Sequence, residues 1–280
     1  MPASPPGSSA SLHIARRRFA TSDGVALNVL EAGQRPDSPV IVFIPGWTMP
    51  AWLWTEQLES LSRTFHVAAM DPRGQGESEM PTGRCGIDRR ADDIAEVVGA
   101  YANVCQRGVV LVAWSLGALE ALHCIARHGT GGIAGVVLVD SSLGLDPAPP
   151  SSAAFREALA RDRGATMRAF VRDLCRKPRP VEEVARLERD AVRMPLQVAL
   201  DLFPSHLPRE RWAGTVEALA LPLLYAVTAQ FSGQADTLRT RRPQSRVELF
   251  ESAGHALFLD EPERFSAMLA QFVASLPADK

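Results

Sequence analysis

The feature that most constrains the fold is a short apolar run that ends at a serine. Residues 110–117 read Val-Leu-Val-Ala-Trp-Ser-Leu-Gly, so a small residue lies two positions away on each side of Ser115. This pattern is typical of a nucleophile elbow, in which a strand turns sharply into a helix and exposes the serine hydroxyl above the sheet. Gly117 fits the usual pattern, whereas Ala113 stands where glycine is commoner. The alternative interpretation is that Ser115 only caps the following helix.

A histidine later in the chain suits the role of general base for this serine. Residues 250–255 read Phe-Glu-Ser-Ala-Gly-His, after the alternating Val247 and Leu249 and before a helical stretch at 262–276. His255 is therefore expected on a small-residue loop at a strand end, from which an imidazole can accept the proton of Ser115.

Two further turns follow buried strands. The run Val-Ile-Val-Phe-Ile at 40–44 breaks at Pro-Gly-Trp, and the N–H of Trp47 could join that of Leu116 in binding the negative charge of a tetrahedral intermediate. The segment Asp-Pro-Arg-Gly-Gln-Gly-Glu-Ser at 71–78 predicts a tight loop. We expect Asp71 and Arg73 to brace that loop rather than to take part in chemistry.

From about residue 18 to residue 275, these signatures and their order resemble the α/β-hydrolase superfamily. The Pro-Gly-Trp turn, the Trp-Ser-Leu-Gly elbow and the Ala-Arg-His-Gly-Thr stretch at 126–130 are similar to bacterial esterases, including the cofactor-free haloperoxidase-like enzymes and the carboxylesterase of biotin synthesis. The resemblance implies an α/β-hydrolase fold and a triad of nucleophile, acid and base in that chain order.

The acid of this triad is not where the resemblance places it. The superfamily usually carries it after the strand that follows the cap, but Thr228 and Phe231 stand at the glycine and aspartate positions of that pattern. Some members take their acid from the end of the preceding strand, where this chain has Asp140. We predict Asp140 as the acid, although it could instead cap a turn. Asp236, in the expected first turns of a helix, and the absence of a working acid remain alternatives.

The alternation of strands with helical stretches predicts a mostly parallel central sheet with helices on both faces. Alternating apolar residues after Ser-Asp-Gly at 22–24 indicate that the first two strands form an antiparallel hairpin. The long helical stretch before the strand at 222–227 exceeds a simple crossover and is interpreted as a cap over the strand ends. The predicted divisions are a disordered tail at 1–11, a core at 12–142 and 220–280, and a helical cap at 143–219.

We call the Pro-Gly-Trp turn at 45–47 the oxyanion turn. Several tryptophans surround this turn and the elbow in the sequence, which favours an aromatic, mostly apolar acyl or aryl site. We expect Trp114, Trp52 and Phe170 to contact the substrate, although each could equally serve core packing.

Composition argues against other classes of function. A net charge of −2 and a pI near 6.3 give no electrostatic reason to bind nucleic acid or an anionic membrane. No apolar stretch reads as a signal peptide or a membrane span, so a cytoplasmic location is expected. No metal is expected, because the four cysteines lack metal-ligand spacing: Cys85, Cys105, Cys124 and Cys175.

The sequence therefore predicts a serine hydrolase that cleaves a small-molecule carboxylic ester, lactone or thioester through an acyl-enzyme on Ser115, without a metal or an organic cofactor. Two other classes remain open on the same scaffold: a ligand-binding receptor or signalling protein, and a cofactor-free oxygenase or perhydrolase. The sequence does not indicate an oligomeric state.

Overall fold

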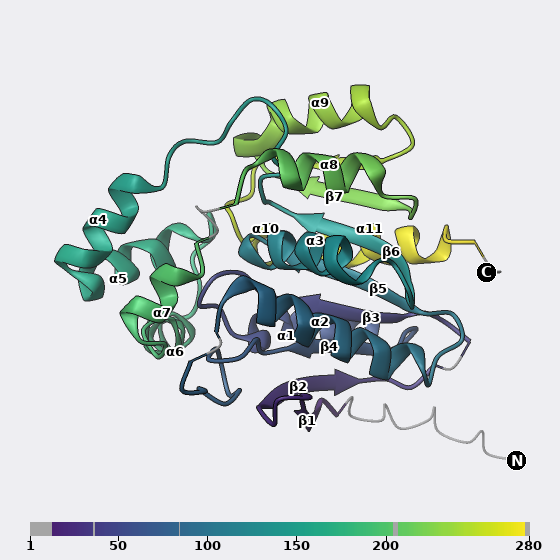
Figure 1. Ribbon diagram of the computed structural model, residues 1–280, viewed down its shortest axis with the longest axis horizontal. Helices are drawn as coiled ribbons and strands as arrows, with labels where there is room; N and C mark the ends of the chain where they lie inside the picture. Colours follow the sequence, from purple (N-terminus) through teal and green to yellow (C-terminus); the bar gives the residue numbers. More distant parts are fainter. Residues whose placement is uncertain (1–12, 36, 84, 204–206, 278–280) are drawn as a thin grey trace, which may run out of the picture.

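An eight-stranded sheet forms the centre of the protein in the computed structural model, which describes residues 13–35, 37–83, 85–203 and 207–277 (Figure 1). The tail predicted at 1–11 lies outside these residues. The strand order is β1-β2-β4-β3-β5-β6-β7-β8. The strands are β1 (Ala15–Ala20), β2 (Ala26–Ala32), β3 (Val40–Ile44), β4 (Val67–Met70), β5 (Val109–Trp114), β6 (Ile133–Val139), β7 (Leu223–Val227) and β8 (Arg246–Leu249).

Among the strands of the described residues, β2 alone runs opposite to the rest of the sheet. It pairs antiparallel with β1 and β4, and every other neighbouring pair is parallel. The predicted hairpin and the mostly parallel sheet are thus confirmed. Because parallel strands end at the same edge, the residues that follow β3, β5, β6, β7 and β8 converge there.

Helices cover both faces of the sheet. Successive side chains of a strand point to opposite faces, and β5 divides accordingly: Val110, Val112 and Trp114 join one hydrophobic cluster, while Val109, Leu111 and Ala113 join the other. The first cluster packs against α1 (Thr55–Leu61), α10 (Leu257–Asp260) and α11 (Pro262–Ala274). The second packs against α2 (Ile87–Ala102), α3 (Leu116–His128), α8 (Glu210–Ala218) and α9 (Ser232–Arg241). Two short 3-10 helices are η1 (Ala51–Trp54) and η2 (Ala229–Phe231).

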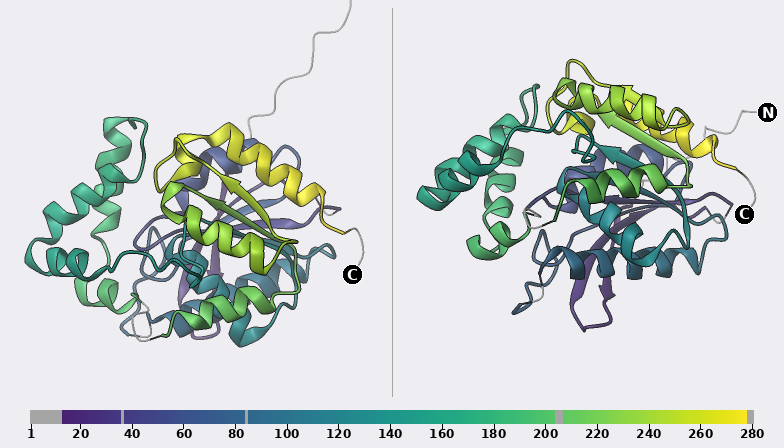
Figure 2. Two further views of the ribbon diagram at one scale, coloured as in Figure 1. Left: turned by 90° about the horizontal axis from the view of Figure 1, so that it is seen from above. Right: turned by 45° about the horizontal axis from the view of Figure 1, so that its top comes forward.

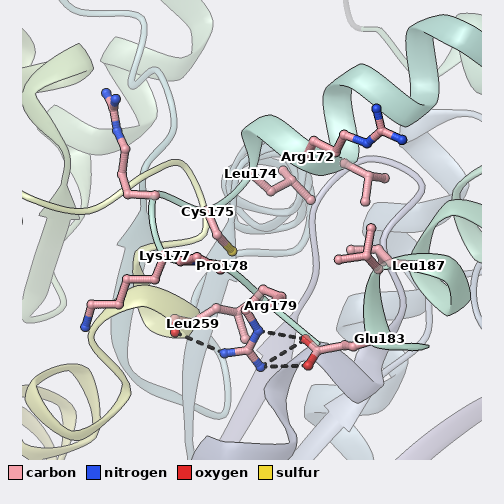
Figure 3. A pocket seen from close by; sticks show the side chains of 12 residues that line it. Arg172, Leu174, Cys175, Lys177, Pro178, Arg179, Glu183, Leu187 and Leu259 are labelled. Carbon is pink, nitrogen blue, oxygen red and sulfur yellow. Dashed lines mark hydrogen bonds and ion pairs between the residues drawn. The ribbon is translucent and has the colours of Figure 1, made fainter. Parts of the chain in front are cut away.

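The remaining helices form a group beside the sheet, at the edge where the parallel strands end (Figures 1 and 2). They are α4 (Ala153–Arg161), α5 (Arg163–Asp173), α6 (Val181–Ala191) and α7 (Leu196–Asp201). Within the predicted cap at 143–219, α8 differs, since it packs on α3. We therefore propose α4–α7 as the cap. A cavity of about 280 Å³ lies where the cap meets the core, between α5, α6 and Leu259 of α10 (Figure 3).

Candidate active site

Ser115, Asp140 and His255 meet at the edge of the sheet where the parallel strands end. The Nε2 atom of His255 lies 2.9 Å from the Ser115 hydroxyl oxygen, and its Nδ1 atom lies 2.7 Å from Oδ2 of Asp140. When Nδ1 carries the ring proton, it donates to the carboxylate and leaves Nε2 to accept the serine proton. The structure thus brings together three residues that follow three different strands, β5, β6 and β8.

The backbone of Ser115 is held in a strained conformation, with φ 56° and ψ −123°. Its side chain makes no capping hydrogen bond to α3, so the simple capping interpretation is wrong. A non-glycine residue with such angles costs about 1–3 kcal/mol, which the surrounding structure must offset. The crowding is visible at Gly117, where an added Cβ would lie 2.6 Å from the carbonyl oxygen of Pro45. A Cβ on Gly46 would lie 3.1 Å from that of Ser115.

Asp140 is fully buried, and both of its carboxylate oxygens are hydrogen bonded to distant parts of the chain. Its Oδ1 accepts hydrogen bonds from the N–H and the hydroxyl of Thr228, at 2.7 and 2.8 Å, while Oδ2 faces His255. Thr228 directly follows β7, the parallel neighbour of β6. The usual pattern has glycine at the position of Thr228. In this chain the threonine instead binds the carboxylate of Asp140, which follows the neighbouring strand.

Asp236, the other candidate acid, lies elsewhere. It sits on α9, as the sequence predicted, with an exposed side chain that accepts a hydrogen bond of 2.7 Å from Arg239. No contact joins it to His255 among the described residues.

The oxyanion turn lies against the elbow through Gly46. Among the residues that the structure describes, the backbone N–H groups of Trp47 and Leu116 donate no hydrogen bond to another protein group. Both are therefore available to an oxygen atom beside Ser115.

Gln75, which the sequence did not single out, fixes the shape of this turn. Its side chain is buried, and its Oε1 accepts a hydrogen bond of 3.2 Å from the N–H of Thr48. Its Nε2 donates to the carbonyl oxygens of Gly46 and Met49, at 3.0 and 2.8 Å. Thr48 has a φ of 59°, so these bonds hold a backbone conformation that a threonine rarely adopts.

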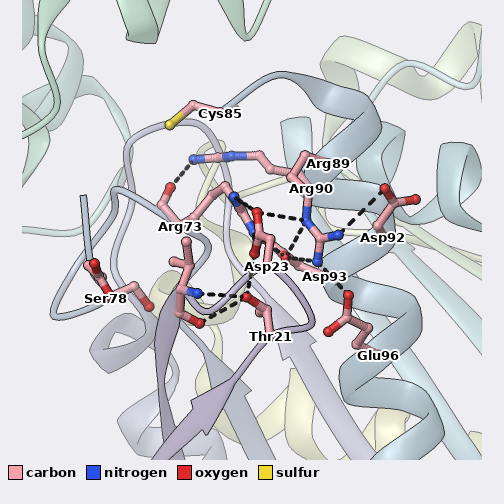
Figure 4. Close-up of polar contacts among 12 residues, drawn as sticks. Thr21, Asp23, Arg73, Ser78, Cys85, Arg89, Arg90, Asp92, Asp93 and Glu96 are labelled. Carbon is pink, nitrogen blue, oxygen red and sulfur yellow. Dashed lines mark hydrogen bonds and ion pairs between the residues drawn. The ribbon is translucent and has the colours of Figure 1, made fainter. Parts of the chain in front are cut away.

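The loop that carries Gln75 is braced by Asp71 and Arg73 as predicted, and Figure 4 shows the contacts of Arg73. Asp71 accepts a hydrogen bond from the N–H of Ala51, and burial raises the pKa of its carboxyl. Arg73 donates to Asp93 on α2 and to Asp23 in the β1–β2 turn. The hydrogen bonds from Arg73 lower the pKa of Asp23. These contacts tie the loop to two neighbouring elements.

Trp114 and Trp52 contact different parts of the protein, the first the loop of His255 and the second α6 of the cap. Trp114 is only 1% exposed, donates its indole N–H to the carbonyl oxygen of His255 at 2.9 Å, and lies 5.1 Å from the imidazole ring. Trp52 donates to Asp190 of α6 at 2.7 Å, and the Arg186 guanidinium covers its ring. Trp114 thus supports His255, while Trp52 anchors the cap.

Phe170 belongs to an aromatic group between the cap and the oxyanion turn. Its ring meets that of Trp47 edge-on at 5.9 Å, and Phe155 and Phe203 approach the same indole at 5.8 and 5.0 Å. The indole N–H of Trp47 donates to the carbonyl oxygen of Ala199 in α7. An apolar wall thus adjoins the oxyanion turn.

A second, polar cavity of about 350 Å³ reaches His255 from the side of the β7–α9 connection. Arg172 and Arg176 of the cap line it, together with Thr228 and Gln230. Within the described ranges, no group of histidine, cysteine or acidic side chains could hold a metal ion, and no helix is long and apolar enough to cross a membrane.

The mostly parallel sheet, the strained serine at a strand-to-helix turn and the adjoining imidazole define the class of an α/β hydrolase. A model of the "Alpha/beta hydrolase family" matches residues 41–268, and the chain belongs to this family.

Relatives in this family include named esterases. The chain is 25% identical over 263 residues to a pimeloyl-(acyl-carrier protein) methyl ester esterase of Vibrio campbellii, covering 86% of this chain and 96% of that one. It is 37% identical over 122 residues, 43% of each chain, to a bifunctional esterase/perhydrolase of Acinetobacter calcoaceticus. A Burkholderia cenocepacia structure provisionally described as an aryl esterase has a TM-score of 0.79 and 28% identity, covering 93% of this chain and 98% of that chain.

Proposed function

We propose that the protein is a serine hydrolase that cleaves a carboxylic ester through an acyl-enzyme on Ser115. The observation that carries the proposal is the unbroken line of hydrogen bonds from the Ser115 hydroxyl through His255 to the buried Asp140. The names of the esterase relatives support the class of substrate.

Each step follows from these contacts. Nε2 of His255 accepts the hydroxyl proton as the Ser115 oxygen attacks the ester carbonyl carbon, and the carbonyl oxygen becomes negatively charged. The N–H groups of Trp47 and Leu116 stabilise that charge. The protonated imidazole, held by Asp140, then donates its proton to the departing alkoxide, which leaves as an alcohol. In the second half of the reaction, His255 accepts a proton from water as the water oxygen attacks the acyl-enzyme carbonyl carbon. The imidazole then returns the proton to the Ser115 oxygen as the bond to the acyl group breaks and the carboxylic acid leaves.

The aromatic group around Trp47 and Phe170 favours substrates with an apolar acyl or aryl part. Lactones and thioesters present the same electrophilic carbonyl and remain candidate substrates. We propose that Trp114 serves this chemistry indirectly, since its exposed fraction of 1% leaves almost no surface for a substrate.

Hydrolysis of short p-nitrophenyl esters tests the proposal. The parent protein should release p-nitrophenol with saturation kinetics, and Ser115→Ala should remove that turnover while leaving the circular dichroism spectrum unchanged. Equal turnover by parent and Ser115→Ala would reject the acyl-enzyme on this residue. Tight ligand binding without turnover would favour a receptor.

Perhydrolysis is a second candidate, favoured by the name of the 37% identical relative. Hydrogen peroxide would then replace water as the attacking molecule on the same acyl-enzyme. Peracid formation that is lost in Ser115→Ala would support perhydrolysis. Oxidation that survives this substitution would show that the oxidation does not use Ser115.

A further inference from the structure

The cap meets the loop of His255 at a buried carboxylate that acyl transfer does not use. Asp260, the last residue of α10, is 1% exposed. Its Oδ2 accepts hydrogen bonds from the backbone N–H groups of Gly254 and Arg176, at 2.7 and 2.9 Å. Its Oδ1 accepts one from the N–H of Lys177 at 2.8 Å. A single carboxylate therefore links the segment that follows α5 to Gly254, the residue before His255.

One further hydrogen bond and one close backbone approach fix the same junction. The N–H of Ala256, the residue after His255, donates to the carbonyl oxygen of Leu174 at 2.8 Å. A Cβ added to Gly254 would lie 2.8 Å from that carbonyl oxygen and 3.0 Å from the N–H nitrogen of Arg176. The chain is thus tied to the cap on both sides of the imidazole.

The segment that carries these ties belongs to the cap. Residues 174–177 begin the connection from α5 to α6. Cys175 and Leu259, from the two sides of the junction, line the cavity in Figure 3. Within the described residues, Asp260 forms no ion pair, so its two oxygens serve only these backbone donors. Hydrogen bonds to a charged acceptor are about twice as strong as neutral ones, which makes this junction stiff.

We propose that Asp260 is a positioning residue that couples the cap to the imidazole of His255, so that displacement of residues 174–177 misaligns His255 with Ser115. The effect on catalysis rests on the proposed function, whereas the mechanical coupling does not. An amide in place of the carboxylate supplies one acceptor oxygen instead of two, so at least one of the three N–H groups loses its partner.

Hydrogen exchange of the full chain tests the coupling without a substrate. In Asp260→Asn, amide exchange should accelerate together in residues 172–178 and 250–257 and stay unchanged in β5. Gly254→Ala, which pushes the two segments apart, should give the same pattern if Asp260→Asn folds poorly. Asp236→Asn makes the same chemical change at an exposed helix position and should alter neither segment.

Kinetics tests the consequence for His255. A misplacement of about 1 Å can cost about 100-fold in rate, so we expect kcat for ester hydrolysis to fall by up to that factor, with KM changing much less. Faster exchange in only one segment, in neither, or throughout β5 in both variants would overturn the coupling. Unchanged kcat with faster exchange in both segments would overturn the positioning role. A parent protein without esterase activity would refute the proposed function, while joint exchange would still support the coupling.

Discussion

The acid assignment gives the sharpest prediction, because the surroundings of Asp140 restrict what an asparagine can do there. In Asp140→Asn, the remaining oxygen satisfies the N–H and hydroxyl of Thr228 only if the new NH2 group faces Nδ1 of His255. That orientation forces the imidazole to carry its proton on Nε2, where it cannot accept the proton of Ser115. The opposite orientation leaves the buried N–H of Thr228 without an acceptor, at a cost of about 1–3 kcal/mol.

Loss of the correct tautomer costs about 10⁴ in kcat in triad proteases, which corresponds to ~5.5 kcal/mol of transition-state stabilisation. We therefore expect a fall of about 10⁴-fold in kcat for p-nitrophenyl ester hydrolysis by Asp140→Asn. The matched control is Asp236→Asn, which should retain full turnover. Both variants must keep the parent's circular dichroism spectrum. A folded Asp140→Asn variant with turnover near that of the parent, or an equal collapse in Asp236→Asn, would refute the assignment.

Three further predictions concern the support of the site. Gln75→Ala should lower kcat by about 10- to 100-fold in steady-state assays, because the oxyanion turn loses the side chain that shapes it. Gly117→Ala should lower the free energy of unfolding in urea by about 1–3 kcal/mol, since its Cβ would press on the carbonyl oxygen of Pro45. The pKa of Asp23 is lower in the folded state than its ordinary 3.8, so its stabilisation is present above that pH and lost as the pH falls below it. Urea melts of Asp23→Asn should therefore show a lower stability at pH 7 and a flatter acid limb, and an unchanged acid limb would argue against the bond from Arg73.

Features that depend on local patterns could be predicted from the sequence. The run of small and apolar residues around Ser115 encodes both a buried strand and the turn that follows, and the strand ends place Asp140 and His255 at one edge of the sheet. The start of a helix near Asp236 could equally be predicted, because the short stretch Ser-Gly-Gln-Ala-Asp-Thr-Leu comes soon after a strand end. In each case the residues that determine the structure are close together in the sequence.

Contacts between distant segments could not be predicted in this way. Gln75 and Asp260 bond to backbone groups of other loops, and nothing in their immediate neighbours distinguishes them from solvent-exposed polar residues. The packing of α8 on α3 could not be predicted either, because the two helices are far apart in the sequence. Thr228 gave a partial signal of the contact with Asp140. A threonine stands there in place of the usual glycine, at the end of the strand expected beside the one that precedes Asp140.

Direct detection of the acyl-enzyme tests the central claim. The parent protein, mixed with a p-nitrophenyl ester and quenched in acid within the first turnover, should gain the mass of one acyl group, located by peptide mass spectrometry on Ser115. Release of p-nitrophenol without such an adduct, or an adduct that persists in Ser115→Ala, would contradict the account.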